Sequence, residues 1–256
     1  MRNLIKMDWY KLRTTKLFGI FLAILFVINA ALVAAGPIVT KLFTSGQEIR
    51  EIGLSEAFAN PISLSLLMIF VFISAISFLY SDFTGGFVKN IAGQVDNRGK
   101  MVISKFIVLG IHNCIFFVVG TLSTILGAVV GGVFTVDGNI LGGVMTFLLK
   151  WLLSMAIGAI LLFMTMGMRN KTFASILGVV LATGTLSLVY MGINAMLANV
   201  FHVAGFDLAD YAPDSLMISV NAITNILVIN ALIVAVAFIA LFVSLTYVAF
   251  KKRDVK

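Results

Sequence analysis

The sequence LFGIFLAILFVINAALVAA, residues 17–35, decides the fold, because it is a long apolar run with no charged side chain. Further apolar runs follow at residues 62–80, 106–130, 145–166, 173–196 and 226–250. Each is about 19 to 25 residues long, and a helix of that length crosses a hydrocarbon core of roughly 30 Å. The pattern predicts six transmembrane helices, and it places the function in or across a membrane.

The composition supports the same class of protein. The chain has 256 residues, of which 61% are hydrophobic and 11% charged, whereas soluble domains carry about 25% charged residues. Backbone polar groups in lipid must bond to one another, so each run should be a helix rather than an open strand. The runs do not alternate as membrane β-barrel strands do. We therefore expect an all-α polytopic membrane protein with one membrane domain over residues 1–256.

The charge distribution predicts the orientation of the chain. The net charge is +7, and most of the 18 lysines and arginines lie in the two termini and in the joints after the second and fourth runs. Positive charge gathers on the cytoplasmic side of membrane proteins. We expect both termini in the cytoplasm and a multi-pass protein of the cell membrane. Charge that is spread over alternate joints in this way argues against nucleic acid as the partner.

Two segments outside the runs are too apolar for free loops. Residues 1–16 place Leu4, Ile5, Trp9 and Leu12 near one helical face, which predicts an interfacial helix; an ordinary basic flank is the alternative. Residues 198–225 mix apolar and acidic side chains. They are too polar to span the membrane, and we expect re-entrant or interfacial helices on the outer side.

Motifs for catalysis are not apparent in the sequence. The two histidines, His112 and His202, are far apart, and the stretch 93–101 has the wrong glycine spacing for a phosphate loop and ends in Met101 instead of Ser or Thr. We expect a chain that hydrolyses no substrate itself and has no catalytic residue, bound cofactor or metal.

The joint after the second run is the most informative one. It reads YSDFTGGFVKN over residues 80–90 and continues through basic residues to Lys105. Two glycines allow a sharp turn out of the membrane, and the apolar side chains that follow exceed what a solvated loop requires. We interpret residues 81–105 as a short helix that docks on a cytoplasmic partner, with a plain orientation loop as the alternative.

The order of these elements resembles the permease subunit of ABC-2 type transporters, and more narrowly the permeases of bacitracin and lantibiotic immunity. The resemblance covers essentially the whole chain. It rests on DFTGGFVKN at residues 82–90, on the basic residues that follow, on the basic aromatic N-terminus and on the half-apolar segment before the last run. The family implies a coupling helix between spans two and three, inserted into a separate ATPase, and re-entrant outer helices between spans five and six.

The resemblance also implies partners and contact residues. Two copies of a cytoplasmic ABC ATPase would bind ATP and Mg²⁺, a second permease subunit, identical or paralogous, would complete the transmembrane part, and the complex would export amphipathic or antimicrobial peptides. The residues expected to couple to the ATPase are Asp82, Phe83, Gly85, Gly86, Phe87, Lys89, Arg98 and Lys105.

The remaining candidates are polar residues near or within the runs. Arg169 and Lys171 form a second cytoplasmic joint, either a secondary contact with the ATPase or an orientation signal. Candidates for lining a transport path are Asn29, His112, Asn113, Lys150 and Asn194, each of which can instead serve helix packing or, for Lys150, extend toward the membrane surface beside Trp151.

Other functions fit the same pattern of runs. An ATP-independent secondary transporter or channel would need paired ionisable residues deep in the spans, and a scaffold or sensor would need no docking segment. An ABC-2 exporter of a drug, sodium, a lipid or a glycan would share the architecture. The resemblance to permeases of bacitracin and lantibiotic immunity favours peptide export among these, while the residues themselves do not identify the cargo.

Overall fold

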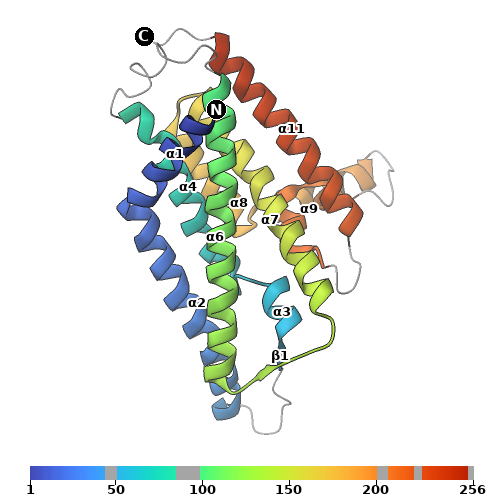
Figure 1. Ribbon diagram of the computed structural model, residues 1–256. Helices are drawn as coiled ribbons and strands as arrows, with labels where there is room; N and C mark the ends of the chain where they lie inside the picture. The colour runs from blue at the N-terminus through green and yellow to red at the C-terminus, as the bar shows by residue number, and fades with distance from the viewer. Residues whose placement is uncertain (44–50, 85–98, 201–206, 222–226, 253–256) are drawn as a thin grey trace.

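The computed structural model describes residues 1–43, 51–84, 99–200, 207–221 and 227–252, which form a bundle of helices (Figure 1). In this part of the chain, five helices are long and apolar enough to cross a membrane, or six if a bent pair is one span. The long helices are α2 (Lys16–Phe43), α4 (Met68–Thr84), α6 (Gly99–Gly131), α7 (Ile140–Leu162) and α11 (Val228–Lys252). These findings confirm an all-α, multi-pass membrane protein.

The first helix, α1 (Arg2–Thr14), confirms the helix expected at the N-terminus. Its apolar face packs against the protein, since Leu12 is fully buried and Ile5 and Trp9 lie on the same apolar cluster of α4 and α6 side chains. The start of α1 and the C-terminal end of α11 lie at the same end of the bundle (Figure 1). We call this the terminal end and the opposite one the loop end.

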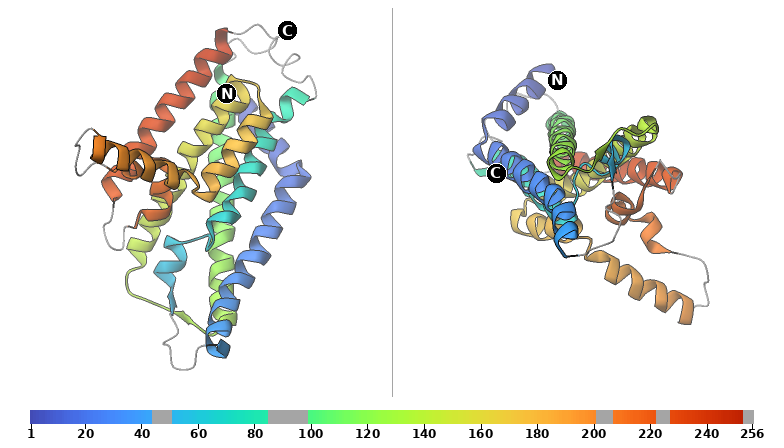
Figure 2. Two further views of the ribbon diagram at one scale, coloured as in Figure 1. Left: turned by 180° about the vertical axis from the view of Figure 1, so that it is seen from behind. Right: turned by 90° about the horizontal axis from the view of Figure 1, so that it is seen from below.

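Helices α2 and α6 lie side by side along most of their length (Figures 1 and 2). Glycines on α6 permit this approach: a Cβ atom at Gly127 would lie 2.6 Å from the carbonyl oxygen of Ala30, and one at Gly131 would lie 3.3 Å from that of Ala34. Small residues of this kind let helix backbones approach closely in membranes. These glycines of α6 therefore serve close packing against α2.

The fifth apolar run is not one straight helix. It is divided into α8 (Lys171–Thr183) and α9 (Leu186–Val200), which meet at an angle of 74°. Gly184 ends α8 in the left-handed conformation, with φ of 67°, which glycine adopts without steric cost. Helix α9 projects away from the bundle (Figure 2) and exposes apolar side chains such as Leu188 and Met191.

Short elements of secondary structure pack together at the loop end. Strand β1 (Ile52–Gly53) pairs in parallel with β2 (Phe134–Thr135), and α3 (Leu54–Ala59) packs against α7. Gly143 of α7 lacks a Cβ atom, which would lie 2.4 Å from the Ser55 carbonyl oxygen, so α3 can pack closely against α7.

Short helices precede the last long helix, in the segment 198–225 that was expected to hold them. They are η3 (Leu208–Tyr211) and α10 (Pro213–Ser219), while residues 201–206 and 222–226 lie outside the described part of the chain. Proline suits the first turn of a helix because it lacks an N–H group, and Pro213 begins α10. Leu216 is fully buried where α10 packs against α7 and α11.

Candidate functional site

Charged side chains gather where α1, α4 and α6 meet at the terminal end. We call Asp8, Lys11, Asp82, Ser104 and Lys105 the ion cluster. Lys105 Nζ lies 2.7 Å from Asp82 Oδ2 and 3.3 Å from Asp8 Oδ1, Lys11 forms an ion pair with Asp82 Oδ1, and the Ser104 hydroxyl donates to Asp8 Oδ2 at 2.6 Å. Two carboxylates and two ammonium groups thus alternate across three helices.

The ion cluster is buried, so the pairing of its positive and negative charges is important for stability. Asp82 is fully buried, Asp8 and Lys105 nearly so, and the ammonium of Lys105 also lies 4.7 Å from the centre of the Phe78 ring. Charges away from water are tolerated when they are paired and hydrogen-bonded. Removing a central member, Asp82 or Lys105, leaves buried charges with fewer partners of opposite sign, which is strongly destabilising. The ion pairs of the ion cluster therefore tie the three helices together.

The sequence of α1 explains how an acid reaches this buried position. Asp8 is three residues after Ile5 and four before Leu12, so all three lie on one face of the helix. That face packs on the protein, and Asp8 is carried inward with its apolar neighbours. A lone acid on the apolar face of a basic helix is a signal that sequence reasoning missed.

The ion cluster also holds both ends of the joint after α4. Asp82 lies in the last turn of α4, which ends at Thr84, and Lys105 lies in the second turn of α6, which begins at Gly99. Their ion pair joins the two helices across the intervening segment. A displacement of that segment would therefore be passed to α1, α4 and α6 together.

The second joint contacts the same end of α4. The guanidinium of Arg169 lies 5.7 Å from the centre of the Phe83 ring, and Lys171 Nζ lies 5.8 Å from that of Tyr80. Arg169 follows a π-helical turn, η2 (Phe163–Gly167), and has a positive φ of 58°. The structure thus brings together the two joints that the sequence had treated as separate contacts.

The residues expected to couple to the ATPase fall into two groups. Asp82 and Lys105 are buried in the ion cluster, so they act within the chain and offer little surface to a partner, and Phe83 is half-buried beside Tyr80. The other expected coupling residues lie outside the described residues, and their contact with an ATPase stays a prediction: Gly85, Gly86, Phe87, Lys89 and Arg98.

Asn29 is a hydrogen-bonding centre between helices. Its amide nitrogen lies 2.7 Å from Ser123 Oγ and 2.9 Å from Thr124 Oγ1 on α6, and its amide oxygen accepts from the N–H group and the hydroxyl of Ser63. The side chain is fully buried. The structure therefore shows Asn29 joining α2 to α6 and to the segment before α4, and its role in a transport path stays a prediction.

His112 and Asn113 form a second buried chain of hydrogen bonds. His112 Nδ1 lies 2.9 Å from Asn113 Oδ1 and His112 Nε2 lies 3.0 Å from Ser74 Oγ, while the Asn113 amide donates to the Ser154 carbonyl and hydroxyl oxygens at 3.2 Å. These contacts link α6 to α4 and α7. Both side chains are fully buried, so here they too serve contact between helices.

Asn194 belongs to the outer segment. Its amide donates to Asp207 Oδ1 at 2.7 Å, and its oxygen accepts from the Leu208 N–H at 3.0 Å. Helix α9 is thereby held to η3, the next described element. Asn194 thus contributes to the outer segment, and the structure does not place it beside the other candidates for a transport path.

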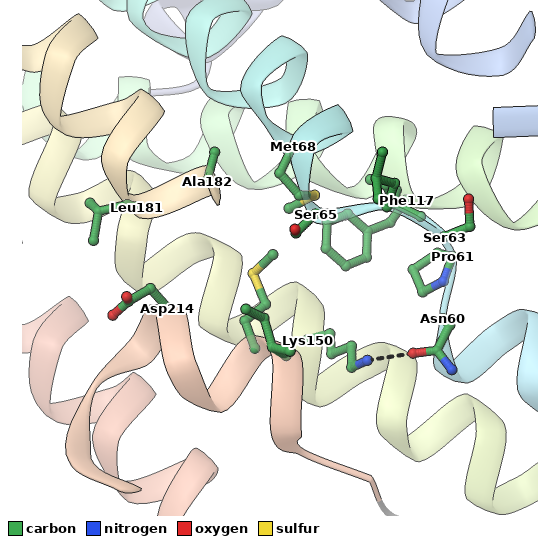
Figure 3. Close-up of a pocket in the computed structure, with 14 residues that line it drawn as sticks. Asn60, Pro61, Ser63, Ser65, Met68, Phe117, Lys150, Leu181, Ala182 and Asp214 are labelled. Atoms are coloured by element: carbon green, nitrogen blue, oxygen red, sulfur yellow. Dashed lines mark hydrogen bonds between the residues drawn. The ribbon is translucent and has the colours of Figure 1, made fainter. Parts of the chain in front are cut away.

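Lys150 differs from the other candidates because it lines a cavity. Its Nζ donates to Asn60 Oδ1 at 2.8 Å, and the side chain is only 8% exposed (Figure 3). It therefore turns inward instead of extending toward the membrane surface. The neighbouring Trp151 donates from its indole nitrogen to the Gly110 carbonyl oxygen at 3.0 Å, so it holds α7 to α6.

We call this space the inner cavity; its volume is about 270 Å³. It lies between α7, α8, α10 and the segment before α4. Asp214 of α10 also lines it (Figure 3). Sequence reasoning missed Asp214 and Asn60, although a carboxylate in a half-apolar outer segment was a signal that could have identified the first.

Comparison with known proteins agrees with the geometry at the terminal end. No curated protein gives a significant match to the chain. The profile described as "ABC-2 family transporter protein" matches residues 4–185, which include α1, both joints and the ion cluster. This match covers more than half of the sequence. The chain therefore belongs to the ABC-2 family of transporter proteins.

Proposed function

We propose that this chain is the permease subunit of an ABC exporter that expels amphipathic or antimicrobial peptides from a bacterial cytoplasmic membrane. Membership of the ABC-2 family implies a separate ABC ATPase as partner. In this proposal two ATPase copies bind ATP and Mg²⁺, and a second permease subunit, identical or paralogous, completes the transmembrane part.

The observation that carries the proposal is the ion cluster at the terminal end. It fixes α1 and both ends of the expected docking segment to one another through buried ion pairs. A plain connecting loop needs no such brace. The arrangement suits a device for passing force from a cytoplasmic partner into the spans, because both ends of the docking segment are held to α1 by the ion pairs.

The mechanism follows from this connection. Closure of the ATPase around ATP would move residues 81–105, and the ion cluster would carry α1, α4 and α6 with them. Arg169 and Lys171 would bring α8 into the same movement, because they contact the aromatic side chains at the end of α4. Coupling of this kind requires two states with different contacts, and the ATPase favours one of them.

The peptide cargo is the finer part of the proposal. It rests on the resemblance of the sequence to permeases of bacitracin and lantibiotic immunity. The broken run of α8 and α9 exposes apolar side chains on a helix that projects from the bundle. Such a surface suits contact with an apolar or amphipathic molecule, or with a second permease subunit.

The test combines assembly with transport. We expect the chain to co-purify with an ABC ATPase expressed beside it, and we expect the reconstituted complex to hydrolyse ATP faster when bacitracin or a lantibiotic is added. Phe87→Asp should abolish co-purification, while Tyr10→Asp, at an exposed aromatic residue of α1, should not. Assembly that survives Phe87→Asp would contradict the docking role.

The cargo is judged separately from assembly. ATP-driven export of another compound, with no response to either peptide, would retain the exporter and overturn the peptide. Transport driven by an ion gradient without any ATPase would overturn both.

A further inference from the structure

The inner cavity contains two buried opposite charges that do not pair with each other. Lys150 points toward Asn60 and the carboxylate of Asp214 lies at the other side of the cavity (Figure 3). Apolar side chains, among them Met68, Phe117 and Leu181, line most of the rest of the cavity. The inner cavity is thus charged at two points and largely apolar elsewhere.

Among the residues that the structure describes, Lys150 has no negative partner. Its ammonium makes one hydrogen bond, to the neutral amide oxygen of Asn60, and no carboxylate of the described residues lies within ion-pair distance of it. An ammonium group has three N–H donors. A buried charge of this kind is normally paired, so an anionic group in the inner cavity would complete its contacts.

Asp214, likewise, has no positive partner within the described part of the chain. The side chain is 3% exposed, and its Oδ1 accepts from the Tyr190 hydroxyl at 2.9 Å. Its Oδ2 is buried and has no hydrogen-bond partner among the residues that the structure describes. Burial raises the pKa of this carboxyl, against the lowering effect of the Tyr190 hydroxyl and of the N–H groups of Asp214 and Ser215. A hydrogen-bond donor with positive charge would satisfy Oδ2.

A second cavity adjoins the first. Its volume is about 310 Å³, and it shares Leu181 and Asp214 with the inner cavity. Its other lining residues are mostly apolar, among them Leu186 and Phe238. Asp214 therefore lies between a space with two charges and a space suited to hydrocarbon.

We propose that these two cavities bind an aminophospholipid. The ammonium group would donate to Asp214 Oδ2, the phosphate would accept from Lys150, and part of an acyl chain would occupy the adjoining cavity. The chain is surrounded by phospholipid in a membrane, and this lipid class has both missing charges on an apolar body. The site does not depend on the ATPase or on the peptide cargo.

The test measures binding of phosphatidylethanolamine to the purified chain in detergent by native mass spectrometry. Phosphatidylglycerol has the phosphate without the ammonium and should bind about tenfold more weakly, since a charge-assisted hydrogen bond is lost. Phosphoethanolamine, which has no acyl chains, should also bind more weakly. Equal binding of the two lipids would overturn the proposal without any variant.

Two variants locate the site. Asp214→Asn and Lys150→Met should each weaken phosphatidylethanolamine binding about tenfold, and Asp214→Asn should leave phosphatidylglycerol binding unchanged. Asp210→Asn, in the neighbouring short helix, and Lys100→Met, at an exposed lysine, are matched controls that should bind as the parent does. Thermal melting confirms that each variant is folded. Variants that bind like the controls would overturn the site, while assembly with an ATPase would remain to be judged by its own experiment.

Discussion

The ion cluster and the inner cavity use buried charge in opposite ways. In the ion cluster, each carboxylate has an ammonium partner, and the pairs join α1, α4 and α6. In the inner cavity, Lys150 and Asp214 line the same space, and neither forms an ion pair with another described residue. The first arrangement stabilises the fold. The second leaves two charges available, which is characteristic of a site that a ligand completes.

The largest effect is expected when a paired charge is removed. Asp82→Ala leaves Lys105 buried beside a single carboxylate and removes the partner of Lys11. We expect a loss of about 3 to 5 kcal/mol in the free energy of unfolding, the typical effect of breaking a buried ion pair. Denaturant titration in mixed micelles measures it.

Glu51→Ala, at an exposed acid of the loop end, is the control for that variant and should change the free energy of unfolding little. If Asp82→Ala were as stable as Glu51→Ala, the ion cluster would not be the brace that we describe.

A smaller loss is expected at the rim of the ion cluster. The Lys11 side chain is 27% exposed, so water can compensate part of the lost pairing in Lys11→Met. We expect a loss of about 1 kcal/mol, measured by the same titration. Lys6→Met, at an exposed lysine of the same helix, should have no measurable effect. A loss from Lys11→Met equal to that from Asp82→Ala would show that the two positions are equally buried in solution.

In the inner cavity, removing a charge is expected to increase the stability of the fold instead of lowering it. Because burial raises the pKa of Asp214 above its ordinary value of 3.8, its protonated form is favoured by folding. This contribution to stability is fully present below pH 3.8 and is lost as the pH rises through the raised pKa. In lipid-free detergent at neutral pH, Asp214→Asn should therefore stabilise the chain by about 1 kcal/mol, because the buried negative charge of the carboxylate is removed.

Melting temperatures of the parent and of Asp214→Asn between pH 4 and 8 check this expectation. The difference should grow as the pH rises. A variant that is less stable than the parent at neutral pH would show that the Asp214 carboxylate is satisfied within the fold, and the contrast with the ion cluster would disappear.

The smallest effect is expected at a carboxylate near water. Asp137 Oδ1 accepts from the Ser55 N–H at 2.8 Å, and Oδ2 accepts from the Ser55 hydroxyl. These hydrogen bonds lower the pKa of Asp137 below 3.8. Its contribution is present above pH 3.8 and is lost as the pH falls through the lowered pKa. Asp137→Asn should therefore reduce the fall in melting temperature at acidic pH. If the melting temperatures of variant and parent fell equally as the pH is lowered, the contact between Asp137 and Ser55 would be contradicted.

The sequence predicted the long helices well because their signal is local. Runs of apolar residues must become helices in lipid, and the structure has them at the expected places. The break within residues 173–196 was not predicted. Gly184 lies inside an apolar run, where a single glycine is compatible with a straight helix. Its left-handed conformation is therefore visible only in the structure, where the following segment packs in another direction.

The candidate site was predicted only in part, and the reason is physical. Asp82 and Lys105 were identified from the joint that contains them, but their partners Asp8 and Lys11 lie on another helix, and long-range pairing leaves no local pattern in one sequence. Lys150 was identified because a lysine in an apolar run is conspicuous. Asp214 was not, because it lies among other acids of an outer segment and only the fold places it on the inner cavity.

The most direct test of the central claim measures peptide export per ATP hydrolysed by the reconstituted complex, comparing Lys11→Met with Lys6→Met. If the ion cluster passes movement from the ATPase into the spans, Lys11→Met should assemble and hydrolyse ATP but export at least about fivefold less peptide per ATP, at the lower end of typical coupling energies. Equal export per ATP in the two variants would contradict the claim.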